Sequence, residues 1–173
     1  MKRISDAMES QLNAQLTREL EASQYYLSLS AWAEVKGFPG IAKFLFTHSN
    51  EERGHALKFF TYINQRGGHA RIHALPTPAG DPETLLALFE SILNQEVNNS
   101  DEIGKLVDLA LEERDHATNS FLQWFVTEQL EEEALINNVL DQLKVIGNEK
   151  ADRGGLYEFD RNIQSIHQEF SNG

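Results

Sequence analysis

Apolar and small side chains recur every three or four positions along most of the chain, the spacing of a buried helical stripe. Over residues 6–36 this stripe consists of Leu12, Leu16, Leu20, Ser23, Leu27, Ser30 and Ala33. Over residues 41–66 it continues through Ile41, Leu45, Phe59 and Tyr62. Only Gly37-Phe38-Pro39-Gly40 separates the two patterns, so they predict two long antiparallel helices joined by a tight turn.

A segment without periodicity follows. Residues 67–82 begin with Gly67-Gly68 and contain Pro76, Pro78 and Pro82. Such a segment is long enough to run the length of a helical bundle. We therefore expect it to cross over, so that the third helix runs parallel to the second.

Residues 83–146 have a helical pattern without a clear break, but a single helix over this range would be roughly 96 Å long at about 1.5 Å per residue. The chain must fold back near the middle. Residues 115–120 contain many helix-capping residue types and are the best candidate for the turn, which predicts helices at about 83–113 and 118–146. The polar residues 98–101 are the competing position, although a turn there would leave very unequal helices.

Past Gly147, Leu156, Phe159, Ile163 and Ile166 predict a short fifth helix at about 155–166. The expected fold class is all-α. Residues 1–173 are expected to form a single domain, a four-helix bundle with a long crossover between its second and third helices.

Composition narrows the range of functions. Asp and Glu number 27 against 15 Lys and Arg, and the formal net charge of −12 disfavours a nucleic-acid partner. The absence of cysteine excludes disulfides, thiolate chemistry and Cys-ligated metals. The N-terminus has no apolar signal region, and no run of about 18 apolar residues occurs, so we expect a soluble, cytoplasmic protein without a membrane partner.

The inward stripe of each predicted helix is polar near its middle. One carboxylate falls on each stripe: Glu19, Glu52, Glu96 and Glu132. Burying four carboxylates together is costly, and no Lys or Arg occupies these stripe positions to neutralise them. Glu52 and His55 also form a Glu-x-x-His pair, whose spacing directs both side chains to one place. The pattern therefore predicts a pair of bound metal ions, with iron, manganese or zinc suited to these ligands.

The expected positions of the four carboxylates along the bundle axis support this arrangement in part. Glu96 and Glu132 lie at similar sequence distances on either side of Asp115, so these two should be nearly level. Glu19 lies farther before Pro39 than Glu52 lies after it, which is a looser match. His48, one turn from Glu52, is interpreted as a core histidine rather than as a ligand.

Several motifs resemble the bacterial non-haem ferritins, over essentially the whole chain. They are Arg18-Glu19-Leu20 followed by Tyr26 and Ser30-Ala31-Trp32, then His48 with Glu51-Glu52-x-x-His55, and Phe121-Leu122-Gln123-Trp124 followed by residues 128–133. The resemblance implies a ferritin-like bundle with a ferroxidase centre, with Glu19, Glu52 and His55 at a first iron. It implies that Glu52 also bridges to a second iron held by Glu96 and Glu132.

The same resemblance implies three further features. Glu51, Glu128 and Glu131, with Glu132, are similar to a third iron site. Tyr26 is similar to the tyrosine beside the centre, and Gln129 to the glutamine near the oxygen-binding face. The implied substrates are ferrous iron and either dioxygen or hydrogen peroxide. The implied assembly is a homo-24-mer shell that stores ferric mineral. Haem is not expected, because Arg53 stands where bacterioferritins have a haem-ligating Met.

Two other function classes remain in view. A di-metal oxygenase or oxidase could use the same bundle, although the second Glu-x-x-His that would favour it is replaced by Gln129-x-x-Glu132. A non-catalytic bundle that sequesters metal is disfavoured by the complete set of ligands.

Overall fold

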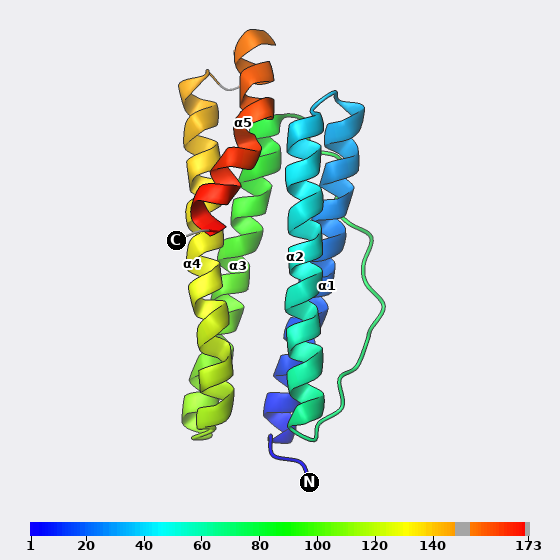
Figure 1. The fold of residues 1–173 in the computed structure, drawn as a ribbon. Helices are drawn as coiled ribbons and strands as arrows, with labels where there is room; N and C mark the ends of the chain where they lie inside the picture. The colour runs from blue at the N-terminus through cyan, green and yellow to red at the C-terminus, as the bar shows by residue number, and fades with distance from the viewer. Residues whose placement is uncertain (148–152, 172–173) are drawn as a thin grey trace.

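The computed structural model describes residues 1–147 and 153–171, and within them the chain forms five helices (Figure 1). These are α1 (Asp6–Val35), α2 (Pro39–Gln65), α3 (Leu85–Glu112), α4 (His116–Val145) and α5 (Arg153–Ser171). The first four lie side by side as two antiparallel pairs, α1 with α2 and α3 with α4. The predicted all-α bundle is confirmed.

Local sequence explains where the helices begin. The side chains of Ser5 and Thr84 accept hydrogen bonds from the amides of Met8 (2.9 Å) and Ala87 (3.1 Å) at the starts of α1 and α3. Asp115 caps α4 by accepting from the amide of Thr118 at 3.1 Å. The chain therefore turns between Glu112 and His116. Of the predicted turn residues 115–120, only Asp115 lies in this connection and 116–120 belong to the start of α4, whereas the competing residues 98–101 lie inside α3.

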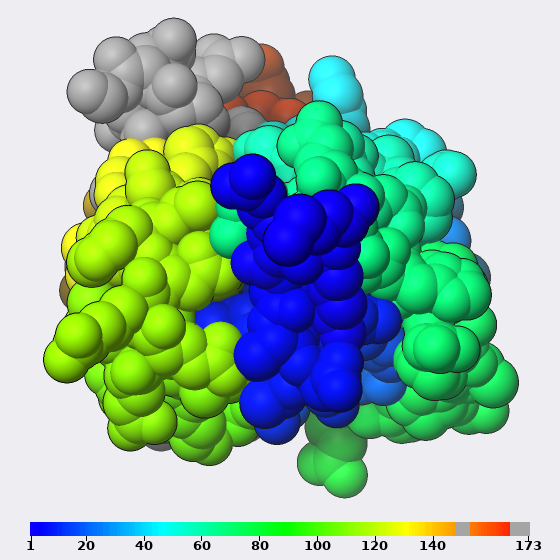
Figure 2. Space-filling model, turned by 90° about the horizontal axis from the view of Figure 1, so that it is seen from below, coloured from blue at the N-terminus to red at the C-terminus, as the bar shows by residue number. Residues whose placement is uncertain are grey.

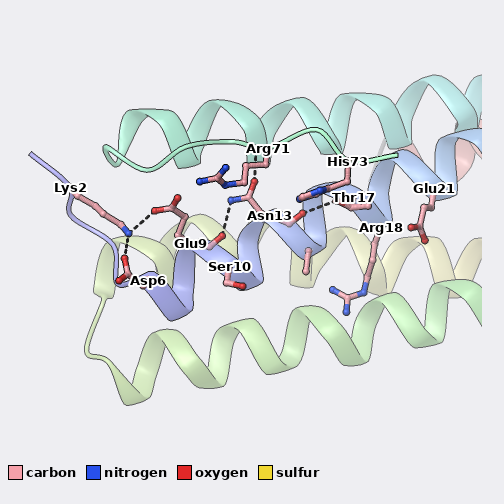
Figure 3. Close-up of a pocket in the computed structure, with 11 residues that line it drawn as sticks. Lys2, Asp6, Glu9, Ser10, Asn13, Thr17, Arg18, Glu21, Arg71 and His73 are labelled. Atoms are coloured by element: carbon pink, nitrogen blue, oxygen red, sulfur yellow. Dashed lines mark hydrogen bonds and ion pairs between the residues drawn. The ribbon is translucent and has the colours of Figure 1, made fainter. Parts of the chain in front are cut away.

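The crossover runs along α1 from the end of α2 to the start of α3, so these two helices are parallel, as predicted (Figure 1). The Asn13 side chain fastens its first part, accepting from the Arg71 amide at 2.6 Å and donating to the carbonyl of His69 at 3.1 Å. Figure 3 shows Asn13 and Arg71 in contact at a surface hollow of about 690 Å³, with Lys2, which forms ion pairs with Asp6 and Glu9, at one end of it.

The N-terminal residues close one end of the bundle. Figure 2 shows them lying across this end, between the α3–α4 turn and the end of α2. The Arg3 amide donates to the carbonyl of Arg66 at 2.8 Å, and the Ser5 hydroxyl donates to Glu113 at 2.6 Å. The Arg66 guanidinium in turn donates to Asp115 at 3.1 Å. This polar network ties both loops at this end to the start of the chain.

The fifth helix is longer than the predicted 155–166 and spans Arg153–Ser171. Gly154-Gly155 has the composition of a break, but glycines are tolerated in a first helical turn when later residues are anchored. Phe159, Ile163 and Ile166 provide that anchor, because all three are buried. The helix packs on α2 and α4 near the end of the bundle opposite the N-terminus (Figure 1).

Asp160 of α5 joins this helix to the start of α2. Its carboxylate accepts hydrogen bonds from the amides of Gly40 (3.1 Å) and Ile41 (2.8 Å), which are unpaired at a helix N-terminus. A Cβ atom at Gly40 would overlap with the backbone carbonyl of Asp160. Glycine is therefore needed at position 40 for the approach of α5.

Gly40→Ala is expected to destabilise the protein by about 1–3 kcal/mol, because α5 must shift to relieve the overlap. Urea unfolding checks the prediction, with Gly104→Ala in α3 as the matched control. A Cβ at Gly104 meets no atom within 4 Å, so that variant should be as stable as the parent or gain up to about 1 kcal/mol. Equal midpoints for the two variants would contradict the described contact between α2 and α5.

Two apolar clusters fill the bundle, one toward each end. The cluster near α5 includes Leu29, Leu45, Ile92 and Leu135. The cluster near the N-terminus is built around Leu16, Phe59, Ile103 and Phe125. Between them lies a layer of buried polar side chains, which we call the polar layer: Glu19, His48, Glu52, His55, Glu96, Gln129 and Glu132.

Within residues 1–147 and 153–171, no helix has both the length and the apolar character needed to cross a bilayer.

Candidate metal centre

The first group of ligand types joins α1 to α2. His55 Nδ1 lies 3.4 Å from Glu52 Oε2 and 3.8 Å from Glu19 Oε2, and one ligand atom from each of the three residues lies within 4.8 Å of the others. All three side chains are buried. The i, i+3 spacing of Glu52 and His55 places both on the inward face of α2, as the sequence predicted.

Glu96 of α3 faces these residues across the bundle and is held on both oxygens. The Tyr26 hydroxyl donates to Oε1 at 2.7 Å, and the Gln129 amide donates to Oε2 at 3.2 Å. Tyr26, Glu96 and Gln129 are all buried. The structure thus brings the two predicted auxiliary residues, Tyr26 and Gln129, to the same carboxylate.

The second group consists of His48, Glu51 and Glu132. His48 Nε2 lies 3.6 Å from Glu132 Oε2 and 4.0 Å from Glu51 Oε2, and ligand atoms of the three again lie within 4.8 Å of one another. The Phe44 carbonyl, which can only accept, lies 2.9 Å from His48 Nδ1. The proton therefore belongs on Nδ1, and Nε2 is the atom presented to the carboxylates.

His48 lies among the carboxylates, although the sequence pattern favours a core histidine rather than a ligand at this position. It does pack in the core, against Phe44 and Tyr26, as that pattern predicts. Its position three residues before Glu51 and four before Glu52 is the signal that could have placed it with the carboxylates, because such residues share one helix face.

The two remaining acidic residues of the predicted third site are placed differently. Glu128 Oε1 lies 3.7 Å from His55 Nε2, so it contacts the first group from α4. Glu131 is exposed on α4 and belongs to neither group. Of the predicted third-site residues, the structure therefore brings only Glu51 and Glu132 into one group.

Burial raises the pKa of three of the four inward carboxylates. It raises the pKa of Glu52 well above the usual value, and the neighbouring Glu96 and Glu19 add to that rise. Burial also raises the pKa of Glu132 well above the usual value, with Glu96 and Glu51 adding to it. For Glu96, burial raises the pKa against the opposing hydrogen bonds from Tyr26 and Gln129.

Glu19 and His55 form the charged pair of the centre. Burial would raise the pKa of Glu19, but interactions with His55, Glu52 and Gln15 outweigh it and leave that pKa lowered. Burial would lower the pKa of His55, but the surrounding carboxylates Glu128, Glu19 and Glu52 raise it to about 12. Without metal, His55 is therefore an imidazolium at neutral pH.

The donor set fits metal ions of the type that the sequence predicted. Within the described residues, the buried Oε2 atoms of Glu19, Glu52 and Glu132 make no hydrogen bond. Buried oxygens left without donors are costly, and a cation relieves that cost by replacing the lost solvation. Oxygen ligands with one imidazole in each group suit iron, manganese or zinc.

Comparison with known proteins places this geometry in a family. The family model described as a ferritin-like domain matches residues 9–146, which include all four bundle helices except the first few residues of α1. The chain belongs to the ferritin family. It is 37% identical over 163 residues to a probable bacterial non-heme ferritin-like protein of Haemophilus influenzae, covering 94% of this chain and 97% of that protein.

Other ferritins are similar in sequence and in structure. The bacterial non-heme ferritin of Campylobacter jejuni is 36% identical over 163 residues, covering 94% of this chain and 96% of the relative. An open pore ferritin from the hyperthermophilic archaeon Archaeoglobus fulgidus superimposes with a TM-score of 0.90 at 34% identity, covering 94% of this chain and 98% of that one. The predicted resemblance to bacterial non-haem ferritins is thus confirmed, and the fold is the ferritin fold.

Proposed function

We propose that this ferritin chain is an iron-storage ferroxidase, which oxidises ferrous iron at the polar layer for storage as a ferric mineral. The observation that carries the proposal is the pair of His/carboxylate groups buried midway along the bundle. Iron is the substrate, and dioxygen or hydrogen peroxide is the oxidant.

Two ferrous ions would bind at neighbouring positions. Glu19, Glu52 and His55 would hold the first, and Glu52 would bridge to the second, held by Glu96 and Glu132. His48 is a candidate additional ligand on the Glu132 side, because its Nε2 lies 3.6 Å from that carboxylate. Several anionic oxygens in a water-poor site favour the ferric over the ferrous state, which supplies a driving force for oxidation.

The electron balance is simple. Two ferrous ions each give one electron to dioxygen, which takes up two protons and leaves as hydrogen peroxide. The His55 imidazolium must lose its proton when Nδ1 binds iron, so metal binding releases at least one proton. Tyr26 and Gln129 keep Glu96 oriented during this step through their hydrogen bonds.

Glu51, Glu128 and Glu131, with Glu132, are proposed as a third iron site on the path away from the centre. Glu51 and Glu128 each contact a group at the polar layer, and Glu131 lies on the adjacent exposed turn of α4. The wide spread of these carboxylates suits an ion in transit better than a tightly held one. Storage itself would occur in a homo-24-mer shell, as in the wider family.

The decisive experiment loads the metal-free protein with two ferrous ions per chain without oxygen and then mixes it rapidly with oxygenated buffer. We expect oxidation far faster than that of the same iron in buffer alone, with one dioxygen consumed per two irons, followed by mineral growth on further additions. Oxidation no faster than in buffer would favour passive sequestration. Fast turnover without mineral, by a protein whose native mass is that of a small oligomer, would favour an oxidase or oxygenase.

A further inference from the structure

A chain of three side-chain amides connects two of the carboxylates in the polar layer. Gln15 Nε2 donates to Glu19 Oε1 at 2.6 Å and to Asn99 Oδ1 at 2.5 Å. Asn99 Nδ2 donates to Gln129 Oε1 at 3.3 Å, and Gln129 Nε2 donates to Glu96 Oε2 at 3.2 Å. The amide chain thus runs from Glu19 on α1 to Glu96 on α3, through α4.

Groups at its two ends fix the direction of this chain. At one end Arg18, which can only donate, points Nη1 at Gln15 Oε1 at 3.4 Å, so the NH₂ group of Gln15 must face Glu19 and Asn99. At the other end Gln129 Nε2 also lies 3.2 Å from the backbone carbonyl of Glu96, which can only accept. With both ends fixed, Gln15 donates to Glu19 and Gln129 donates to Glu96, and Asn99 between them accepts from Gln15 and donates to Gln129.

This direction determines which Glu19 oxygen is available. Oε1 is occupied by Gln15, whereas Oε2 faces His55 Nδ1 at 3.8 Å and makes no hydrogen bond within the described residues. Glu19 therefore presents a single, oriented oxygen to the place where His55 and Glu52 converge. Gln15 has no exposed surface, so water does not compete for this contact.

The amide chain also lies between the centre and the outside of the bundle. Asn99 lines a groove of about 630 Å³ between α1 and α3, beside crossover residues 76–79. Arg18 of α1 forms an ion pair with Glu102 of α3 at 2.6 Å in the same groove. That ion pair holds the guanidinium that orients Gln15.

We propose that Gln15, oriented by Arg18 and linked through Asn99, is a positioning residue that selects the Glu19 oxygen for the metal shared with Glu52 and His55. This inference rests on the proposed function only in assuming that a metal binds at this group. Partners that orient a metal ligand in this way typically change metal affinity by about 10–100-fold when removed.

Gln15→Met tests the proposal, because methionine keeps the length and burial of the side chain and removes its amide. Cobalt(II) is the probe, titrated without oxygen and followed by the visible absorption of the bound ion, which reports ligand geometry. The matched control is Gln95→Met, because Gln95 lines the same groove from α3. Thermal unfolding of the metal-free proteins measures any general loss of structure.

The expected result is that Gln15→Met weakens cobalt binding at the stronger site about 10–100-fold and changes its spectrum, whereas Gln95→Met does neither. Unchanged affinity and spectrum in Gln15→Met would overturn the proposal. So would an equal loss at all sites accompanied by a lowered unfolding midpoint, which would make Gln15 a structural residue. If the parent protein itself binds no cobalt, the proposed function fails first, and that result is distinct from the other two.

Discussion

Replacing Glu52 and His55 together by alanine is expected to slow iron oxidation by more than about 100-fold, exceeding the usual effect of losing a supporting residue. Glu52 lies at the centre of the polar layer, facing Glu19 and His55 and within the electrostatic influence of Glu96. The double variant removes two of the three proposed ligands at the first site and the proposed bridge to the second. Stopped-flow oxidation of two ferrous ions per chain measures the rate.

The matched control is Glu112→Ala with His116→Ala, which makes the same change in composition at exposed positions on either side of the α3–α4 turn. That variant should oxidise iron at the parent rate. Equal rates in the Glu52/His55 variant and the parent would show that oxidation occurs elsewhere on the protein. Thermal unfolding of the metal-free double variant is measured alongside, because removing His55 leaves buried Glu19 without its charged partner and a loss of stability must be separated from the loss of rate.

The metal-free protein is expected to lose stability as the pH rises from about 7 to about 9, by about 1.4 kcal/mol per pH unit for each extra proton held by the folded state. His55 has an unfolded pKa of 6.5 and a folded pKa of about 12. Its contribution is fully present below the unfolded pKa and is lost as the pH rises toward the folded one. The raised pKa values of Glu52 and Glu132 act in the same direction.

At acidic pH the change of stability with pH has the opposite sign, so stability is expected to fall as the pH falls. Interaction with His55 lowers the pKa of Glu128, and the pKa of Glu19 is also lowered. These two groups contribute stability above their unfolded pKa of 4.5 that is lost as the pH falls through their folded values. Stability without metal should therefore be greatest in the mildly acidic range.

Metal binding is expected to reverse the loss of stability at alkaline pH, because the bound ions take the place of the protons on the buried carboxylates and His55. Zinc at about 100 times its dissociation constant would add about 2.7 kcal/mol, and more at higher pH, where fewer protons must be displaced. Thermal unfolding with and without zinc at about pH 6 and about pH 8 measures both effects. A zinc-induced shift that is larger at the lower pH would contradict the assigned protonation.

Much of the fold could be predicted because the lengths of the helical patterns and the positions of the glycines, prolines and capping residues constrain it strongly. The helical pattern over residues 83–146 is too long for one helix of a compact bundle, and Asp115 offered the capping side chain that the structure uses at the turn. The extent of α5 could not be predicted in the same way. Its first turn contains two glycines, and only tertiary contacts, such as Asp160 with the start of α2, determine that it forms there.

The buried carboxylates were predictable because each is expensive to bury, so its presence on an inward stripe needs an explanation. Counting along the sequence left Glu19 and Glu52 several positions out of register. In the structure α1 ends at Val35 and α2 begins at Pro39, so His55 lies as far into α2 as Glu19 lies before the end of α1, and these two are level. Glu52 lies one helix turn from His55, which accounts for the mismatch between the positions of Glu19 and Glu52 counted from the turn.

Uncharged residues in and beside the polar layer were harder to predict. Gln15 carries no charge and lies beside the inward stripe rather than on it, so burial cost gives no signal. Its position one turn before Glu19 is a signal only once that carboxylate is known to be a ligand. His48 posed a similar difficulty, because packing alone is a sufficient explanation for a single histidine in a core.

The polar layer between two apolar clusters also specifies how the helices align along their long axes. If one helix slipped by a single turn, about 5.4 Å, its inward glutamate would leave the level of the other three and move toward one of the apolar clusters. Bundles with uniformly apolar seams have no such penalty between neighbouring alignments. The side chains of the candidate metal centre therefore also determine the axial register of the bundle, and a fully apolar redesign would lose that register together with the candidate site.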